Sequence, residues 1–498
     1  MKKKWLLFIL LIVIKNISSA QMQIECQEAE YRGSELILTG KAKIDHSLAT
    51  IEGDCLTLYT DEKKSSAIEP KKIIVKEKVF LNFHEKGNVK CHQALLDFDQ
   101  LQAFCWGKKD RADLLFTWHG WQKEAVLKIS AAQLQLNLEK SVKSGDKQIH
   151  LLLRSVEAAD QVKAQYNDQF TIIADHAFYA AANAEEFSSL KGKLVITAKD
   201  GFFCQLFTEQ KEEITAKKII IDLATQTIYG EKVKGHFCTD FPLLTQQVHF
   251  QAERLSWKLS SKELTLWEKV VVSQEQLQIS TKENLILNYK LTGKRKQLDS
   301  IVAPNGAQIA YQGALEQQSY QITSPGKYYL DYGQDILYVQ SLPEIEKENL
   351  EYEPIVIKTW QGEMQARSMV IKGSKQEKQR LLPYLVILKD QVQFAGYIGK
   401  QLLKNVYCQY ALADELTYFP LENKLYLKGK EKKRVLFWDQ NQGIKMSAPA
   451  LDLCYDKRTQ KESIKGKGNV RFTFTEKENG YLSQKFHFNL SHVPKEVL

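Results

Sequence analysis

Residues 213–235 read EITAKKIIIDLATQTIYGEKVKG, and this stretch decides the fold class. Ile219, Ile221 and Leu223 occupy every second position in it. A period of two places them on one side of a β-strand and the residues between them on the other side. A short polar break then precedes a second alternating run that contains Gly230. The stretch therefore predicts a β-hairpin with a glycine at its corner.

The same pattern recurs along the chain as a small residue, an alternating strand, a polar break, a second strand, a glycine and a valine. Clear copies span residues 252–272, 413–437 and 448–474, and weaker copies begin at Ala29, Ala94, Ala132, Ala174 and Ala366. The distance from the small residue to the glycine varies between copies, as expected when strand pairing is fixed and loops vary. Such repetition favours a fold that grows by adding strands.

The composition is that of a globular β-protein. Of 498 residues, 44% are apolar and 26% are charged, and 21 Tyr and 22 Phe stand against only 10 Pro, which favours strands. Eight cysteines are too few for a disulfide scaffold of this length, so apolar packing must stabilise the fold. His236 and Cys238 are the nearest approach to a metal-ligand pair, and without two further ligands they predict no metal site.

The N-terminus predicts a secretory signal peptide over residues 1–20. Lys2–Lys4 precede an apolar run at residues 5–14, and small residues lead to Ala20. A helix of about ten residues spans roughly 15 Å, too short for a bilayer core of about 30 Å. An uncleaved anchor remains the alternative. Residues 1–20 contain four lysines and no acid, so their removal lowers the formal net charge from +9 to a modest +5. No basic run with interleaved aromatics predicts nucleic-acid binding.

Short strands without crossover helices exclude a doubly wound parallel sheet and leave a sandwich, a barrel or a stacked solenoid. The repetition favours stacking. Three local features refine this fold. Residues 177–190 predict a short helix, the lysine-rich residues 294–296 predict a solvated corner, and the acidic residues 342–354 predict a boundary between regions 21–341 and 355–498.

The units at residues 216–233, 252–272, 413–437 and 448–474 resemble the OstA-like (LptA-like) domain of the periplasmic lipopolysaccharide-transport proteins, found also in LptC and at the N-terminus of LptD. The resemblance implies an all-β fold of repeated β-jellyrolls, in which stacked antiparallel strands form two facing sheets around an elongated, solenoid-like groove. It also implies acyl chains of lipopolysaccharide or lipooligosaccharide between the sheets, and contacts with other transport-bridge proteins through sheet edges. The expected location is the periplasm, with association to the inner or outer membrane left open.

The hypothesis of a lipid conduit assigns groove-lining roles to apolar residues of the central repeats, which are Ile219, Ile221, Leu223, Leu255, Trp257, Leu259, Leu264, Leu266, Leu285, Leu287 and Tyr289. The alternative is that the same residues fill a closed core of an exported structural or adhesive β-solenoid without a ligand. No GxSxG, no HExxH and no recognisable Ser, His and Asp arrangement occurs. The sequence therefore predicts no enzyme, no catalytic residues and no cofactor.

Cys91 and Cys105 flank a candidate hairpin tip at residues 97–99. If that tip is correct, the two cysteines lie opposite each other on neighbouring strands. A disulfide between them is then expected in an oxidising compartment, with a pair of buried free thiols as the alternative.

We expect cleavage after Ala20 and export of the mature chain across the inner membrane. The reason is the order of basic, apolar and small residues at the N-terminus. The mass of the protein recovered from cells shows whether the chain is cleaved after Ala20. A chain in the membrane fraction that retains Met1 would contradict cleavage and support the anchor.

Overall fold

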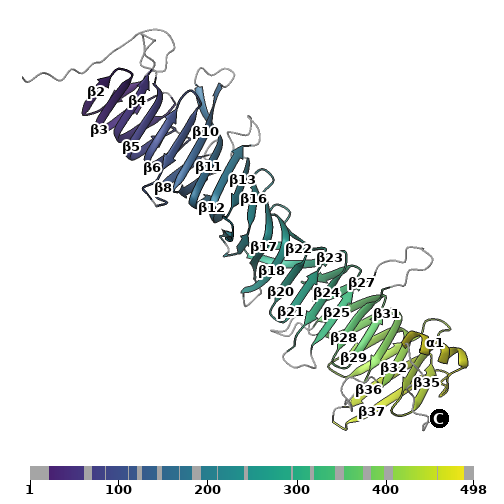
Figure 1. Cartoon of the computed structure of the whole chain (residues 1–498). Helices are drawn as coiled ribbons and strands as arrows, with labels where there is room; N and C mark the ends of the chain where they lie inside the picture. Colours follow the sequence, from purple (N-terminus) through teal and green to yellow (C-terminus); the bar gives the residue numbers. More distant parts are fainter. Residues whose placement is uncertain are drawn as a thin grey trace, which may run out of the picture. The chain divides into compact units, whose positions relative to one another are not determined.

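The computed structural model describes residues 22–486 with gaps at 47, 61–69, 85, 110, 120–125, 143–148, 168, 182–191, 210, 241–244, 293–294, 314–318, 342–352, 374–382, 398–407 and 457. These residues form 37 strands and one short helix, so the predicted all-β fold class is confirmed (Figure 1). The chain divides into two compact units, Met1–Lys199 and Asp200–Leu498. Among the residues described, no helix is long and apolar enough to cross a membrane.

The first unit contains thirteen strands, whose neighbours within the unit pair antiparallel. They are β1 (Gln23–Glu25), β2 (Glu28–Arg32), β3 (Glu35–Asp45), β4 (Thr50–Thr60), β5 (Pro70–Asn82), β6 (Gly87–Asp97), β7 (Gln102–Trp106), β8 (Leu114–His119), β9 (Val126–Ala131), β10 (Gln133–Val142), β11 (Ile149–Tyr166), β12 (Phe170–Ala181) and β13 (Gly192–Thr197).

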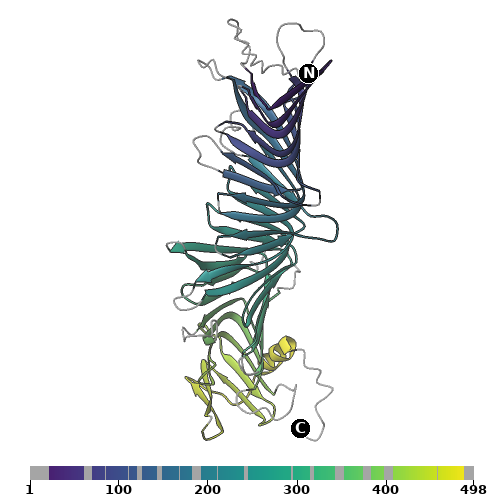
Figure 2. The ribbon, with the colours of Figure 1, turned by 90° about the vertical axis from the view of Figure 1, so that its left-hand side faces the viewer.

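The long strands of the first unit bend partway along their length, and Figure 2 shows this curvature in the purple and blue strands. The pairing register shifts at each bend, for example between Lys76 and Val79 and between Ala159 and Val162. Glu77 and Asp160 at these shifts have a positive φ. A bulge bends its strand, so the two halves of one strand enter two different ladders.

Each ladder of the first unit has a buried apolar row whose members lie opposite one another. One row is Leu38, Leu56, Val75, Ala94, Cys105, Leu134, Ala158, Ala177 and Ile196. The other is Ile44, Ile51, Leu81, Val89, Phe116, Ile129, Ala164 and Ile172. Direct cross-strand pairing of apolar side chains is the contact that holds neighbouring strands in register.

The second unit contains the remaining strands and helix α1 (Glu476–Phe486). The strands are β14 (Cys204–Thr208), β15 (Glu213–Ala216), β16 (Lys218–Asp222), β17 (Thr227–Asp240), β18 (Thr245–Lys258), β19 (Glu263–Trp267), β20 (Val270–Gln274), β21 (Leu277–Thr281), β22 (Asn284–Thr292), β23 (Arg295–Ala303), β24 (Ala307–Tyr311), β25 (Tyr320–Ser324), β26 (Tyr328–Asp331), β27 (Ile336–Gln340), β28 (Ile355–Thr359), β29 (Gly362–Ala366), β30 (Ser368–Gly373), β31 (Pro383–Gly396), β32 (Gln409–Phe419), β33 (Lys424–Lys428), β34 (Val435–Asp439), β35 (Ile444–Ala448), β36 (Ala450–Asp456) and β37 (Lys461–Lys467).

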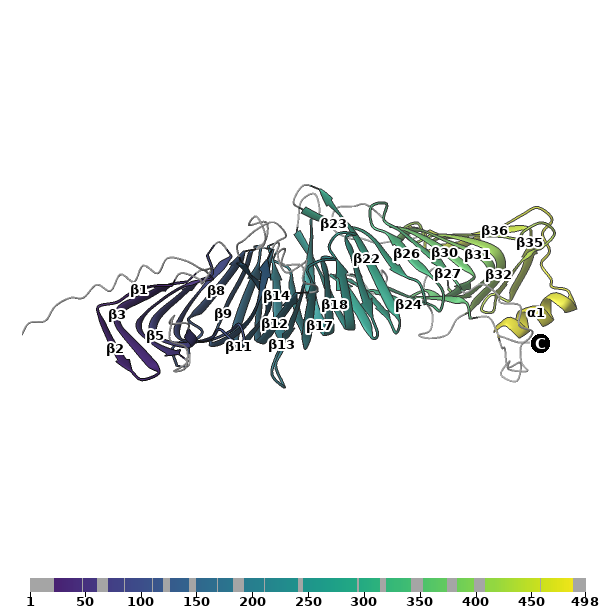
Figure 3. The same cartoon turned by 90° about the horizontal axis from the view of Figure 1, so that it is seen from above.

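Two ladders run through the second unit. The β16 ladder is formed in order by β16, parts of β17 and β18, β19, β22, β23, β26, β27, β30, parts of β31 and β32, β33, β36 and β37. The β15 ladder is formed by β14, β15, the other parts of β17 and β18, β20, β21, β24, β25, β28, β29, the other parts of β31 and β32, β34 and β35. Figure 3 labels several of these strands side by side.

Bends again join the two ladders of this unit. Lys232, Lys269 and Asp390 lie at bends and have a positive φ, which a side chain other than glycine seldom adopts. Gly306 lies at a further bend, between β23 and β24, and its φ is +84°. Most strands or strand pairs among the described residues thus contribute one segment to each ladder.

Helix α1 covers the outer face of the last strands of the β15 ladder. Leu482 packs against Leu412 and Leu436, and Phe486 lies edge-on to Tyr410. Glu478 closes a capping box, because its N–H donates to Thr475 Oγ1 at 3.2 Å and its carboxylate accepts from the Thr475 N–H at 2.8 Å.

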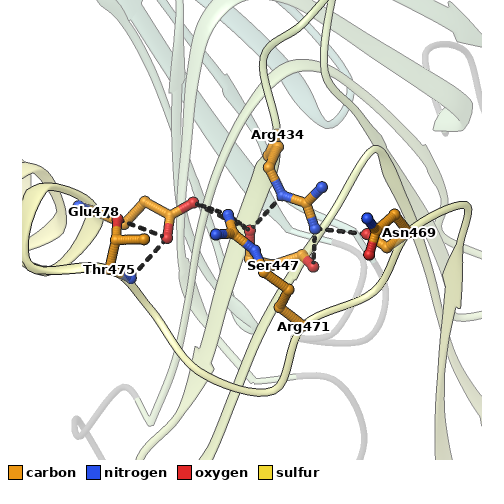
Figure 4. A network of polar contacts seen from close by, with 6 residues as sticks. All are labelled: Arg434, Ser447, Asn469, Arg471, Thr475 and Glu478. Atoms are coloured by element: carbon orange, nitrogen blue, oxygen red, sulfur yellow. Dashed lines mark hydrogen bonds and ion pairs between the residues drawn. The ribbon is translucent and has the colours of Figure 1, made fainter.

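A polar network anchors the start of this helix, as Figure 4 shows. Arg471 donates to Glu478 at 2.6 Å, and Arg434 donates to the Ser447 hydroxyl at 2.8 Å and to the Asn469 carbonyl at 2.5 Å. Ser447 is fully buried and also donates to Glu478 at 3.2 Å. The network therefore ties the helix to β35 and to Arg434, which directly precedes β34.

Two local expectations need correction, and one element was not predicted. Ala177–Ala181 belong to β12, so a helix there is wrong, and residues 182–191 lie outside the described residues. The strand expected up to Phe474 ends at Lys467, because the chain turns there toward α1. The helix itself was missed, although Thr475 and Glu478 have capping-box spacing.

The expected hairpin register is also wrong. The turn lies at residues 98–101, so Cys105 is opposite Ala94, while Cys91 is opposite Val79. The neighbouring Cys91 thiol, together with burial, nevertheless raises the pKa of the Cys105 thiol. Both cysteines are free in this structure, and the disulfide stays a prediction.

Two expectations concern residues that the structure leaves out. The signal peptide at 1–20 and most of the boundary at 342–354 lie outside the described residues. Strands on both sides of that boundary pair with each other, β25 with β28 and β27 with β30. The division into regions 21–341 and 355–498 stays a prediction, while the compact units divide at Lys199.

We expect Leu482→Ala to lower the free energy of α1 docking by about 2–5 kcal/mol, because it removes the apolar contact with Leu412 and Leu436. Thr475→Ala should cost about 1 kcal/mol through the lost cap. Hydrogen exchange of the α1 amides measures both effects. The exposed Thr473→Ala change is the control, and it should leave exchange as in the parent. Parent-like protection in Leu482→Ala would contradict the docking.

Candidate functional site

The structure places nine of the eleven predicted lining residues on one face of the β16 ladder, while Leu223 and Leu259 directly follow the ends of β16 and β18. Trp257 lies opposite Leu264, and Leu264 lies opposite Leu287. Leu266 pairs with both Leu255 and Leu285 in the same way. All are buried except Leu259, which is half-buried, and the buried ones are Ile219, Ile221, Leu223, Leu255, Trp257, Leu264, Leu266, Leu285, Leu287 and Tyr289.

The apolar row continues far beyond the predicted residues. From Leu287 it passes directly across successive strands, each member opposite the next. The continuation is Ile301, Leu330, Leu337, Ile371, Val386, Tyr418, Leu425 and Leu453. Sequence reasoning missed these residues, although each stands at the predicted period of two.

A matching row in the β15 ladder faces the same interior. Its members are Ile214, Phe250, Val272, Ile279, Ile309, Ile322, Ile357, Met364, Phe394, Ala411, Phe437 and Met446, with Gly235 between the first two. The two ladders contact each other at Tyr328 of β26, whose hydroxyl donates to the Ala307 carbonyl of β24 at 2.6 Å. The second unit therefore contains two facing apolar surfaces.

Side chains fill the space between the two surfaces near Trp257. Ile214, Phe250 and Trp257 are among the residues that line a cavity of about 10 Å³ there. A cavity needs about 10–15 Å³ to hold even one water molecule. An acyl chain can therefore occupy this level only if the two ladders move apart.

A buried ion pair joins the ladders on the side away from the bends. Lys296 Nζ on β23 lies 2.5 Å from Glu212 Oε2, next to β15, and Glu212 is fully buried. Thr208 Oγ1 donates to the same carboxylate oxygen at 2.7 Å. Residues 294–296 were expected to form a solvated corner, and for Lys296 this is wrong. The burial of Lys296 could not be predicted from the neighbouring sequence, because its partner Glu212 is 84 residues away.

Aromatic rings surround the Lys296 ammonium. Its Nζ lies 4.4 Å from the centre of the Trp257 ring and 5.5 Å from that of Tyr289. The Trp257 indole N–H donates to the Tyr289 hydroxyl at 3.0 Å. Burial lowers the pKa of Lys296, although Glu212 opposes this shift, and burial raises the pKa of Tyr289 to about 12.

Tyrosines form two further bridges between the ladders. The Tyr332 hydroxyl donates to the Gln274 side chain, and the Tyr418 hydroxyl donates to that of Gln361. Burial raises the pKa of Tyr418, so this hydroxyl keeps its proton and remains a donor at neutral pH. These bridges close the interior opposite the bends at several levels.

The comparisons with known proteins add no assignment. No family model matches the chain, and no curated protein matches it. Among the residues that the structure describes, no group of three His, Cys, Asp or Glu side chains is placed to hold a metal ion.

We expect Lys296→Met to cost about 3–5 kcal/mol of unfolding free energy, because it leaves the Glu212 carboxylate buried without its cation. The double change Lys296→Met with Glu212→Gln should recover much of this loss. Urea unfolding measures both.

Lys290→Met is the matched control for that experiment. Lys290 Nζ lies 3.2 Å from Asp299, but both side chains are about half exposed, so the loss should stay within about 1 kcal/mol. Equal effects of Lys296→Met and Lys290→Met would contradict a special role for the buried pair.

Proposed function

We propose that this chain is a periplasmic lipid-binding conduit of the OstA-like (LptA-like) kind, which shields the acyl chains of lipopolysaccharide on the way from the inner to the outer membrane. The observation that carries the proposal is the pair of facing apolar rows, which pass from strand to strand with few interruptions. In this proposal each unit is a stack of OstA-like β-jellyroll repeats, and the groove is the space between its ladders.

Such a conduit works by area and needs no single binding site. Shielding a few hundred Å² of acyl surface at about 25 cal/mol per Å² is worth on the order of 5–10 kcal/mol before ordering costs. Adjacent strands repeat every 4.7–4.9 Å or so and present similar apolar side chains. A lipid displaced by one strand therefore finds a site of nearly equal free energy, which permits movement along the row.

The filled interior near Trp257 requires the ladders to separate when lipid enters. The bends make this possible, because Lys232, Lys269 and Asp390 are joints at which a backbone change widens the angle between ladders. The acyl chain would then replace the contacts that Trp257 and Tyr289 lose. The buried bridge between Lys296 and Glu212 would have to open at the same time.

The partners of the proposal follow from chemistry and from the sheet edges. A lipid with a phosphorylated sugar suits a chain with a net positive charge. In the first unit β1 and β2 both pair with β3, and in the second unit β37 pairs with β36. Edge strands of this kind can take up a strand of another transport-bridge protein.

The second candidate is an exported structural or adhesive β-protein without ligand. The cavity of only about 10 Å³ near Trp257 favours it. Here the same rows are a permanent core, and the Lys296 bridge never opens. The two candidates differ in whether lipid ever contacts the inward side chains.

We expect a photo-crosslinking residue at Ile219, Trp257 or Leu285 to capture lipopolysaccharide in cells that make it. These side chains point inward and are buried. Ile220 and Lys258 are the controls, since neighbours in a strand face opposite sides of the sheet. Capture is measured as a shifted band that reacts with antibody to lipopolysaccharide.

Two outcomes of that experiment would contradict the conduit. One is a folded, exported protein in which no inward position captures lipid, and this result favours the structural protein. The other is equal capture at Ile220 and Ile219, which would indicate surface adsorption. Circular dichroism of each purified variant checks that the fold is intact.

A further inference from the structure

The outer face of the β16 ladder has an apolar row of its own. Six residues on successive strands lie directly opposite one another along this face, and they are Ile286, Val302, Tyr329, Tyr338, Val370 and Ile387. Tyr329 is 36% exposed and Tyr338 40%, with ring centres 6.1 Å apart. We call these six residues the outer apolar row. Tyr329 and Tyr338 are exposed, and the other four residues are half-buried in the part of the chain that the structure describes.

The β15 ladder provides an internal comparison. The corresponding row on its outer face is polar at five of six positions, namely Ser280, Gln308, Thr323, Val356, Gln365 and Gln393. Beyond Gln393 the same row becomes apolar at Leu412 and Leu436, where α1 covers it. This row is thus mostly polar where it meets water and apolar where α1 packs on it.

We propose that the outer apolar row is the interface of a two-fold dimer of this chain, in which two β16 ladders pack face to face. Beyond the row the same line passes through hydroxyl side chains, Thr265 and Ser256 toward the exposed Tyr229 and Thr417 toward the exposed Tyr426, so the whole face spans eleven strands. At about 4.8 Å per strand it is roughly 50 Å long, and three residues across give a width of about 15 Å. The area of about 750 Å² approaches the roughly 800 Å² per partner of a standard stable interface.

A second copy fits this surface better than other occupants do. Sheets twist with a fixed hand, and a second copy has the same twist over the same length. Two such faces can pack about 10 Å apart with their side chains interdigitated, at an angle near −30°. A flat lipid surface cannot follow a twisted face over many strands.

The charges beside the row support a two-fold axis parallel to β27. Asp331 on β26 and Lys372 on β30 both lie opposite Ile336 of β27, on the same side of the row. Rotation about an axis parallel to β27 exchanges the positions of β26 and β30 between copies. Asp331 of each copy then faces Lys372 of the other, and Tyr338 lies near its own counterpart.

Sedimentation velocity of the purified full chain over a concentration series tests this dimer. We expect a reversible dimer for the parent and a dissociation constant at least about tenfold higher for Tyr338→Glu, because the change places two carboxylates near the axis. Thr323→Glu is the matched control on the polar outer row of the β15 ladder. It should leave the dissociation constant unchanged.

A charge exchange tests the axis itself. Asp331→Lys and Lys372→Asp should each weaken the dimer, and the double variant should restore it. A parent that stays monomeric at all concentrations overturns the proposal, as do equal effects of Tyr338→Glu and Thr323→Glu. Failure of the double variant to recover overturns the placement of the axis. None of these results depends on lipid, so they are independent of the proposed conduit.

Discussion

The structure depends on one constraint, the direct pairing of apolar side chains across neighbouring strands at a period of two. Ile371, for example, lies opposite Leu337 on one side and Val386 on the other. A slip of one residue would turn each of these side chains outward and bring their neighbours into the interior. Since the rows extend over many strands, a slip at one strand conflicts with the register of all the next. The interior row is therefore the feature that specifies the fold.

The fold also requires the bends. A strand that belongs to two ladders must change direction at the bend, so that its alternate side chains point to the interior in both ladders. A bulge with a positive φ does this at Glu77, Asp160 and Asp390. These side chains are polar, and lysines pair with two of them, Lys199 with Asp160 at 2.8 Å and Lys430 with Asp390 at 2.6 Å. Exposed pairs of this kind contribute little free energy. Their value is that a charged residue can occupy a bend without leaving a polar group in the core.

How much could be read from the sequence follows from how local each interaction is. The alternation around Ile219 predicted the strands and the shared face, because both depend on neighbours within one strand. The prediction that Cys91 and Cys105 lie opposite each other was wrong, because the turn begins at Phe98 and not at Asp97. The sequence alone does not indicate where this turn begins. The buried state of Lys296 could not be predicted, since Glu212 is remote in sequence. Helix α1 could have been found from the capping box at Thr475.

The interior and the outer face of the β16 ladder impose different demands on one set of strands. The inward side chains must be apolar whether they form a permanent core or a lipid path, so burial alone does not separate these two functions. The outward side chains have no such requirement, and the β15 ladder shows that glutamine and threonine suffice there. Tyr329, Val370 and Ile387 on the β16 ladder are therefore unexplained by the internal packing of the chain. The proposed contact with a second copy would supply a physical reason for an apolar row on this face.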